Sequence, residues 1–162
     1  MSSLNIQWSR LAEVLNEGQN FLLTGHARPD CDCLGSELGM AGLLESLGKT
    51  VRIINADPTP ERLAFIDPHN KVEILGDRSP EEVLEGIDTI IVLDTSAWDQ
   101  LGAMAEVLRV LPRPTTSRPK QRTRSKAPSD TISTIFGVLG SGPTTERSWV
   151  VETTPRPCWQ GP

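Results

Sequence analysis

The stretch Phe21–Gly39, FLLTGHARPDCDCLGSELG, constrains the fold of this chain more than any other. It begins with the apolar run 21–23, which is typical of a strand buried on both faces. A polar elbow follows, and Gly35 and Ser36 are predicted to open a helix. A second apolar run, 51–54, comes soon after that helix. A strand, a helix and a strand with short connections predict a βαβ unit, so we expect an α/β domain with a parallel sheet.

Three chemically active side chains lie in the elbow, and a fourth follows a later strand. His26, Asp30 and Asp32 come after the first strand, and Asp94 directly follows the apolar run Thr89–Leu93. Ligands bind at the carboxyl ends of strands in open α/β sheets, so we expect these four side chains to meet there. An imidazole with carboxylates suits a divalent cation such as Mn²⁺. The alternative is a plain polar turn, because a carboxylate is favourable at a helix N-terminus without any ligand.

The charge balance favours a metal site over a bare phosphate pocket. Residues 1–110 hold 18 acidic and 8 basic residues, a net charge of −10. Converging aspartates would repel one another, and an acidic body would repel a polyanionic substrate. Divalent cations would relieve both repulsions.

The same residues carry a resemblance to a known family. His26 to Ser36 follow the pattern H-x-x-x-D-x-D-x-x-G-S, which resembles the first motif of the DHH family of phosphoesterases. TIIVLDTS, which contains Asp94, resembles the second motif. The intervening GKTVRIINADPTPERLAFID resembles the branch that cuts short oligoribonucleotides and dephosphorylates 3′-phosphoadenosine 5′-phosphate. The resemblance covers residues 4–110.

The resemblance implies a two-metal site that holds Mn²⁺. By this resemblance His26 and Asp30 hold one ion, Asp32 holds the other, and Asp94 bridges the two ions. His26 and Asp94 are then the candidate catalytic residues. The implied substrate is a short RNA or a nucleotide, and the implied reaction is hydrolysis of a phosphate ester.

Two further residues are candidates for binding the substrate phosphate. Ser36 stands at the predicted helix start, where free N–H groups favour an anion. Arg28 lies in the elbow and offers a guanidinium, although it is equally consistent with a solvated loop residue.

The chain departs from the family after residue 110, where the Asp-His-His triplet is absent. We therefore divide it into 1–110, the N-terminal part of a DHH-type domain, and a largely irregular tail, 111–162. The tail has a net charge of +5 and holds 8 of the 13 prolines, so we expect residues 111–130 to be disordered. Only weak strands are expected, at 132–139 and 149–151. We favour a truncated or frameshifted product over the alternative of an RNA-binding tail.

We thus predict a metal-dependent phosphoesterase that is impaired in this chain. The alternative is a non-catalytic remnant or nucleotide-binding module with a basic tail. The odd cysteine count suits a reducing cytoplasm, and no stretch is long enough to span a membrane, so no membrane partner is expected. The cysteines Cys31 and Cys33 form a C-x-C pattern, but we expect them to pack as small residues because no second pair completes a zinc site.

Overall fold

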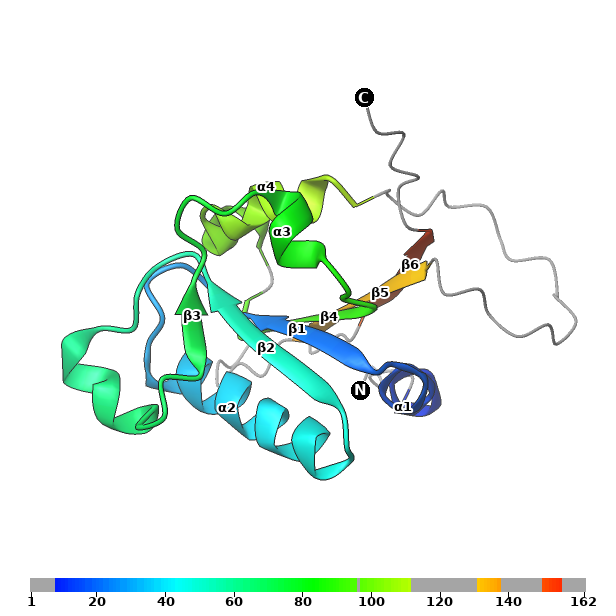
Figure 1. Ribbon diagram of the computed structural model, residues 1–162, viewed down its shortest axis with the longest axis horizontal. Coiled ribbons are helices and arrows are strands. Elements are labelled where there is room, and N and C mark those ends of the chain that lie inside the picture. Colours follow the sequence, from blue (N-terminus) through cyan, green and yellow to red (C-terminus); the bar gives the residue numbers. More distant parts are fainter. Residues whose placement is uncertain (1–7, 96, 112–130, 138–149, 156–162) are drawn as a thin grey trace, which may run out of the picture.

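The computed structural model describes residues 8–95, 97–111, 131–137 and 150–155, and helices and strands alternate from α1 to β4 (Figure 1). The elements are α1 (Trp8–Glu17), β1 (Asn20–Thr24), α2 (Cys31–Ser46), β2 (Thr50–Asn55), η1 (Glu61–Ile66), β3 (Val72–Ile74), α3 (Pro80–Leu84), β4 (Thr89–Leu93), η2 (Trp98–Leu101), α4 (Met104–Arg109), β5 (Thr131–Gly137) and β6 (Val150–Pro155).

The described strands form one sheet with the order β3-β2-β1-β4-β5-β6. The pairs β1–β2, β2–β3, β1–β4 and β4–β5 are parallel, and β6 is antiparallel to β5. The predicted α/β class and parallel sheet are confirmed. The chain moves from β1 outward to β2 and β3, and then returns to add β4 on the other side of β1. The carboxyl ends of β1 and β4 therefore flank a topological switch point.

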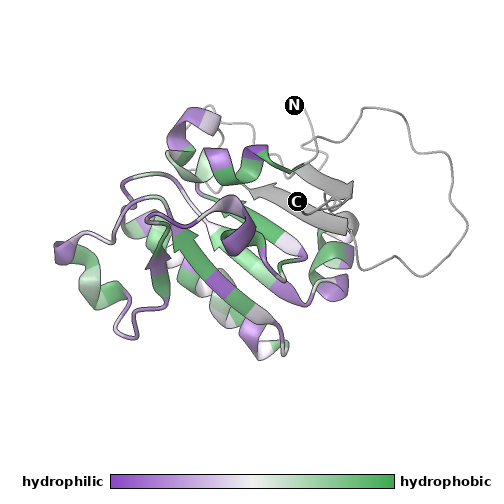
Figure 2. Cartoon of the chain, turned by 45° about the horizontal axis from the view of Figure 1, so that its top comes forward, coloured by the Kyte–Doolittle hydropathy of each residue, from purple (hydrophilic) through white to green (hydrophobic). Residues whose placement is uncertain are grey.

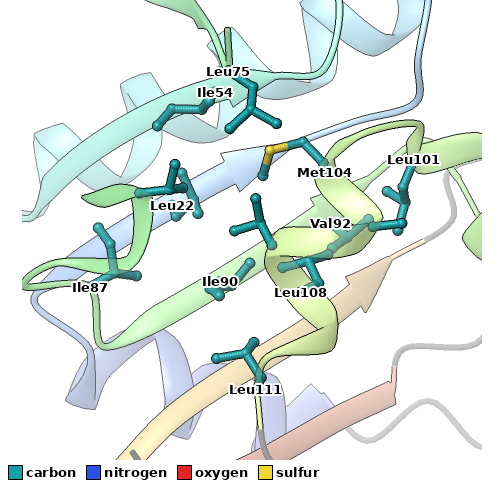
Figure 3. Packing of buried hydrophobic residues seen from close by; sticks show 13 residues of the cluster. Leu22, Ile54, Leu75, Ile87, Ile90, Val92, Leu101, Met104, Leu108 and Leu111 are labelled. Atoms are coloured by element: carbon teal, nitrogen blue, oxygen red, sulfur yellow. The ribbon is translucent and has the colours of Figure 1, made fainter. Parts of the chain in front are cut away.

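Helices cover both faces of the sheet because side chains alternate along each central strand. On β4, Ile90 and Val92 pack with residues of α3 and α4. Figure 3 shows this core, which also includes Leu22 of β1 and Met104 and Leu108 of α4. On the opposite face, Ile91 and Leu93 pack with residues of α1 and α2. Figure 2 shows the central strands as largely hydrophobic, with hydrophilic residues gathered in the loops.

Two helices differ from the sequence prediction. Helix α2 begins at Cys31 rather than at Gly35, because the Asp30 side chain accepts hydrogen bonds from the first backbone N–H groups and so starts the helix early. In the segment 99–110, Leu101, Met104, Ala105 and Leu108 recur at helical spacing and predict one helix, but the segment is broken into η2 and α4. Gly102 lies between them with φ +55°, and a helix cannot continue through that left-handed conformation.

Two segments from beyond residue 110 belong to the sheet. β5 and β6 lie close to the two weak strands predicted there, and β5 extends the parallel order next to β4. The predicted disorder of residues 111–130 falls, after Leu111, outside the described residues. Within the described residues no helix combines the length and apolar character needed to cross a bilayer.

Candidate metal centre

The candidate site lies at the switch point between β1 and β4. His26 follows β1 by two residues, and Asp94 directly follows β4. These strands are parallel neighbours, with Thr24 paired to Val92, so the residues after each strand emerge at the same sheet edge. The structure brings His26 and Asp94 together at this edge, as the sheet rule predicted.

His26 is the centre of the cluster. Its Nε2 lies 3.4 Å from Asp94 Oδ2 and 3.8 Å from Asp30 Oδ1. Its Nδ1 lies 2.9 Å from the carbonyl oxygen of Ala27. A neutral ring that donates from Nδ1 presents the Nε2 lone pair to both carboxylates. Nε2 and the Asp94 carboxylate oxygen are then two acceptors that face each other, and a proton or a cation between them would relieve their repulsion.

A divalent cation fits this donor set. Bond lengths of about 2.0–2.2 Å from one ion leave its nitrogen and oxygen ligands roughly 3–4 Å apart, which is the spacing around His26. The Nδ1 contact with Ala27 is the kind of outer-shell hydrogen bond that fixes the tautomer of a metal-binding histidine.

Asp94 has an unusual backbone and an unfavourable charge environment. Its φ of +55° lies in the left-handed region, which costs energy for a residue with a side chain. Burial raises the pKa of its carboxyl, and the negative charges of Asp32 and Asp30 raise it further, while His26 opposes the rise. Strain and repulsion at one carboxylate are typical of a site that a ligand stabilises.

Asp30 serves two roles at the start of α2. Its Oδ1 accepts hydrogen bonds from the backbone N–H of Asp32 at 3.0 Å and of Cys33 at 3.1 Å. The bond from Cys33 is the largest cause of the lowered pKa of Asp30. The carboxylate is therefore held ionised and in a fixed orientation, with its side chain 59% exposed toward solvent.

The other predicted residues lie near by but in different settings. Asp32 is exposed in the first turn of α2, close enough for its charge to act on Asp94. Ser36 lies within α2 rather than at its start, so the free N–H groups on which its assignment rested are not next to it, and Asp30 occupies those of Asp32 and Cys33.

Arg28 lies in an elbow that its neighbours hold in place. The residue is exposed, and its backbone N–H donates to Asp57 Oδ2 at 2.9 Å. The N–H of Ala27 donates to the carbonyl oxygen of Gln100 at 2.6 Å. The loops after β2 and β4 thus anchor the segment that carries His26.

The two cysteines are placed differently. Cys31 is exposed and Cys33 is buried, so the C-x-C pattern does not present two thiols to one point. The Cys33 sulfur lies within 4.8 Å of ligand atoms of His26 and Asp94. Burial first, and then the charge of Glu37, raise the pKa of the Cys33 thiol well above its usual range, so the thiol is protonated when no cation is bound.

Sequence reasoning missed a buried polar network beneath the cluster. The side chain of Glu37 on α2 is fully buried, and its Oε2 accepts a hydrogen bond from Asn55 Nδ2 at 2.9 Å. Asn55 Oδ1 in turn accepts from the Gly25 N–H at 3.1 Å. A signal was present, because Glu37 shares the apolar stripe of α2 with Leu34, Ala41 and Leu44. Asn55, at the end of β2, is likewise fully buried.

The described strand next to β4 adds no carboxylate or imidazole to the site. β5 has the sequence TISTIFG, which contains neither aspartate nor histidine. The whole chain contains two histidines, and His69 lies in the loop before β3.

The comparisons with known proteins bear on the fold. No protein-family model matches the chain, and no curated protein matches it significantly. A solved structure described as an exopolyphosphatase-related protein from Bacteroides fragilis matches with a TM-score of 0.62 and 18% sequence identity. The match covers 91% of this chain and 39% of that one, so this chain spans less than half the length of its structural neighbour. At this identity the likeness shows the α/β fold.

Proposed function

We propose that this chain is a metal-dependent phosphoesterase of the DHH type that hydrolyses phosphate esters in short oligonucleotides or nucleotide bisphosphates, with low activity. The observation that carries the proposal is the convergence of Asp94 and Asp30 on one histidine nitrogen, at 3.4 Å and 3.8 Å. The similarity in fold to an exopolyphosphatase-related protein supports phosphoryl chemistry at this sheet edge.

We assign the cofactor as Mn²⁺, held by the residues of the cluster. His26 and Asp30 would hold one ion, Asp32 the other, and Asp94 would be shared between them. When bound, such ions polarise a phosphoryl oxygen and lower the pKa of a coordinated water.

The chain's own side chains would orient the reactants. The hydrogen bonds to Asp30 fix its carboxylate, and the hydrogen bond between Nδ1 and Ala27 directs Nε2 of His26 into the cluster. Arg28, exposed in the anchored elbow, is the proposed contact for a substrate phosphate.

Low activity follows from what the chain supplies. Four ligand side chains are few for two ions with a poised water, and the family's Asp-His-His triplet is missing. Positioning contributes many orders of magnitude to catalysis, so a site in which four side chains must position two ions should turn over slowly.

The test is release of phosphate from 3′-phosphoadenosine 5′-phosphate, and of mononucleotides from a short RNA, with and without Mn²⁺. We expect turnover well below the order of 1 s⁻¹ that is usual for enzymes, dependent on Mn²⁺ and abolished by Asp94→Ala. Serine substitution of the exposed Cys31 is the matched control and should leave turnover unchanged. Turnover that persists in Asp94→Ala would refute the proposal, and nucleotide binding without turnover would favour a non-catalytic module.

A further inference from the structure

A fully buried carboxylate on α2 lies directly beneath the candidate site. Glu37 is 0% exposed, and burial raises its pKa to about 7. Burying a carboxylate costs free energy that an apolar side chain of the same shape would not cost. Domain stability alone therefore does not explain a carboxylate at this core position.

Hydrogen bonds connect Glu37, through Asn55, to the backbone next to His26. Glu37 Oε2 accepts from Asn55 Nδ2 at 2.9 Å, which leaves Asn55 Oδ1 to accept from the Gly25 N–H at 3.1 Å. The amide nitrogen of Asn55 needs an acceptor and its amide oxygen needs a donor. With Glu37 as the acceptor, only one orientation of the Asn55 amide satisfies both groups. Glu37 therefore sets which way the amide of Asn55 faces.

Gly25 is the residue immediately before His26, and it is packed so closely that a side chain would not fit there. A Cβ at this position would lie 2.2 Å from Cys33 Sγ and 2.9 Å from Glu37 Oε1. On the other side of His26, the Ala27 N–H is bound by the carbonyl oxygen of Gln100. His26 is therefore held from both flanks, by Asn55 on β2 and by the loop after β4.

We propose that Glu37 is a positioning residue, which orients Asn55 so that the Gly25 amide is fixed and the His26 imidazole faces Asp94 and Asp30. This inference rests on the metal site of the proposed function. The competing view is that Glu37 contributes only to the stability of the domain. The two views differ because a positioning role changes metal affinity in a protein that is still fully folded.

The experiment compares Glu37→Met with Glu37→Gln on the full chain. Methionine has a similar shape but cannot accept from Asn55, whereas glutamine keeps an acceptor oxygen. Glu45→Gln is the matched control, since Glu45 lies on the same helix, is exposed, and pairs with Lys71. Three quantities are measured: Mn²⁺ affinity by calorimetry, the His26 imidazole resonance with His69 as internal reference, and the melting temperature.

We expect Glu37→Met to bind Mn²⁺ at least about tenfold more weakly, as is usual when an outer-shell partner is lost. Its melting temperature should not fall, its His26 resonance should shift, and its His69 resonance should stay in place. Glu37→Gln and Glu45→Gln should bind like the wild type.

Three results would overturn the inference. They are a Glu37→Met protein that binds Mn²⁺ like the wild type, a Glu37→Gln protein that loses as much affinity as Glu37→Met, and a Glu37→Met chain that does not fold. If the wild type itself binds no Mn²⁺, the proposed function fails instead. The His26 resonance then still decides the positioning role, because a shift in Glu37→Met supports it and an unchanged resonance contradicts it.

Discussion

The two ends of β4 each carry an aspartate, and the two are used in opposite ways. Asp88, just before the strand, accepts backbone hydrogen bonds from Gln19 at 3.0 Å and Asn20 at 3.0 Å, and one from the Thr89 hydroxyl at 2.8 Å. Asp94, just after the strand, faces His26 and the charges of Asp32 and Asp30, and its pKa is raised.

The difference separates a structural carboxylate from a binding one. Hydrogen-bond donors of the protein surround Asp88, so its negative charge is compensated within the fold. The same hydrogen bonds connect the start of β1 to the start of β4. Asp94 meets like charges and has a left-handed backbone, so the fold alone leaves it unfavourable. A cation bound at Asp94 would compensate its negative charge, as the backbone amides compensate the charge of Asp88.

The largest expected effect is on metal affinity when Asp94 is neutralised. Asn tolerates the left-handed backbone, so Asp94→Asn should fold normally. Mn²⁺ affinity should fall by more than the roughly 10- to 100-fold typical of losing an outer-shell partner. The melting temperature of the metal-free protein should hold or rise, because a repelled charge is removed. Calorimetry measures the Mn²⁺ affinity, and thermal melts measure the melting temperature. An unchanged Mn²⁺ affinity would show that Asp94 is not a binding carboxylate and so does not differ from Asp88 in this way.

The next effect concerns Glu37 and the pH dependence of stability. Its pKa is raised from 4.5 to about 7 by burial, partly offset by hydrogen bonds from Asn55 and Cys33 and by the charge of His26, while Asp94 adds to the rise. Between these pH values the native state holds a proton that the unfolded state has lost. The free energy of unfolding of the metal-free protein should therefore decrease from pH 4.5 to 7, by up to about 3 kcal/mol.

Glu37→Gln tests this slope, because it removes the titrating group and keeps an acceptor. The free energy of unfolding is measured by denaturant melts with a chelator present, at several values between pH 4.5 and 7. It should depend less steeply on pH in Glu37→Gln than in the wild type. Equal slopes in both proteins would show that Glu37 titrates near its ordinary pKa.

The smallest effect is expected at Asp88, where a substitution should change the stability of the domain and not its affinity for metal. Asp88→Asn loses acceptor capacity for the β1 amides, so the free energy of unfolding should fall by about 1–2 kcal/mol. Mn²⁺ affinity should not change, because Asp88 lies at the amino end of β4. A denaturant melt and a metal titration of the same sample measure both quantities, and weakened Mn²⁺ binding would show that the two aspartates are not separable.

The sequence predicted most of the fold and part of the site, for physical reasons. The apolar runs of β1 and β4 and the glycine-ended helix between β1 and β2 led to the parallel sheet, and the sheet rule then placed His26 and Asp94 together. The start of α2 was mistaken because Gly35 and Ser36 resemble a helix start, whereas the Asp30 side chain caps the backbone four residues earlier.

The Glu37–Asn55 pair could not be found in this way. Glu37 stands on the apolar stripe of α2, which marks it as buried, but its partner depends on how α2 lies across β2. That arrangement is set by packing between elements distant in sequence rather than by a local pattern. The same holds for the break at Gly102, since a glycine within a helical pattern does not by itself show that the helix ends there.

The most direct test of the metal site uses the two histidines of the chain. His26 lies in the cluster, and His69 is exposed in the loop before β3, toward the amino-terminal edge of the sheet. Substoichiometric Mn²⁺ should broaden the imidazole NMR signals of His26 and leave those of His69 sharp, and Asp94→Asn should abolish the selective broadening. Equal broadening of both histidines, or none at His26, would contradict a cation site at the carboxyl ends of β1 and β4.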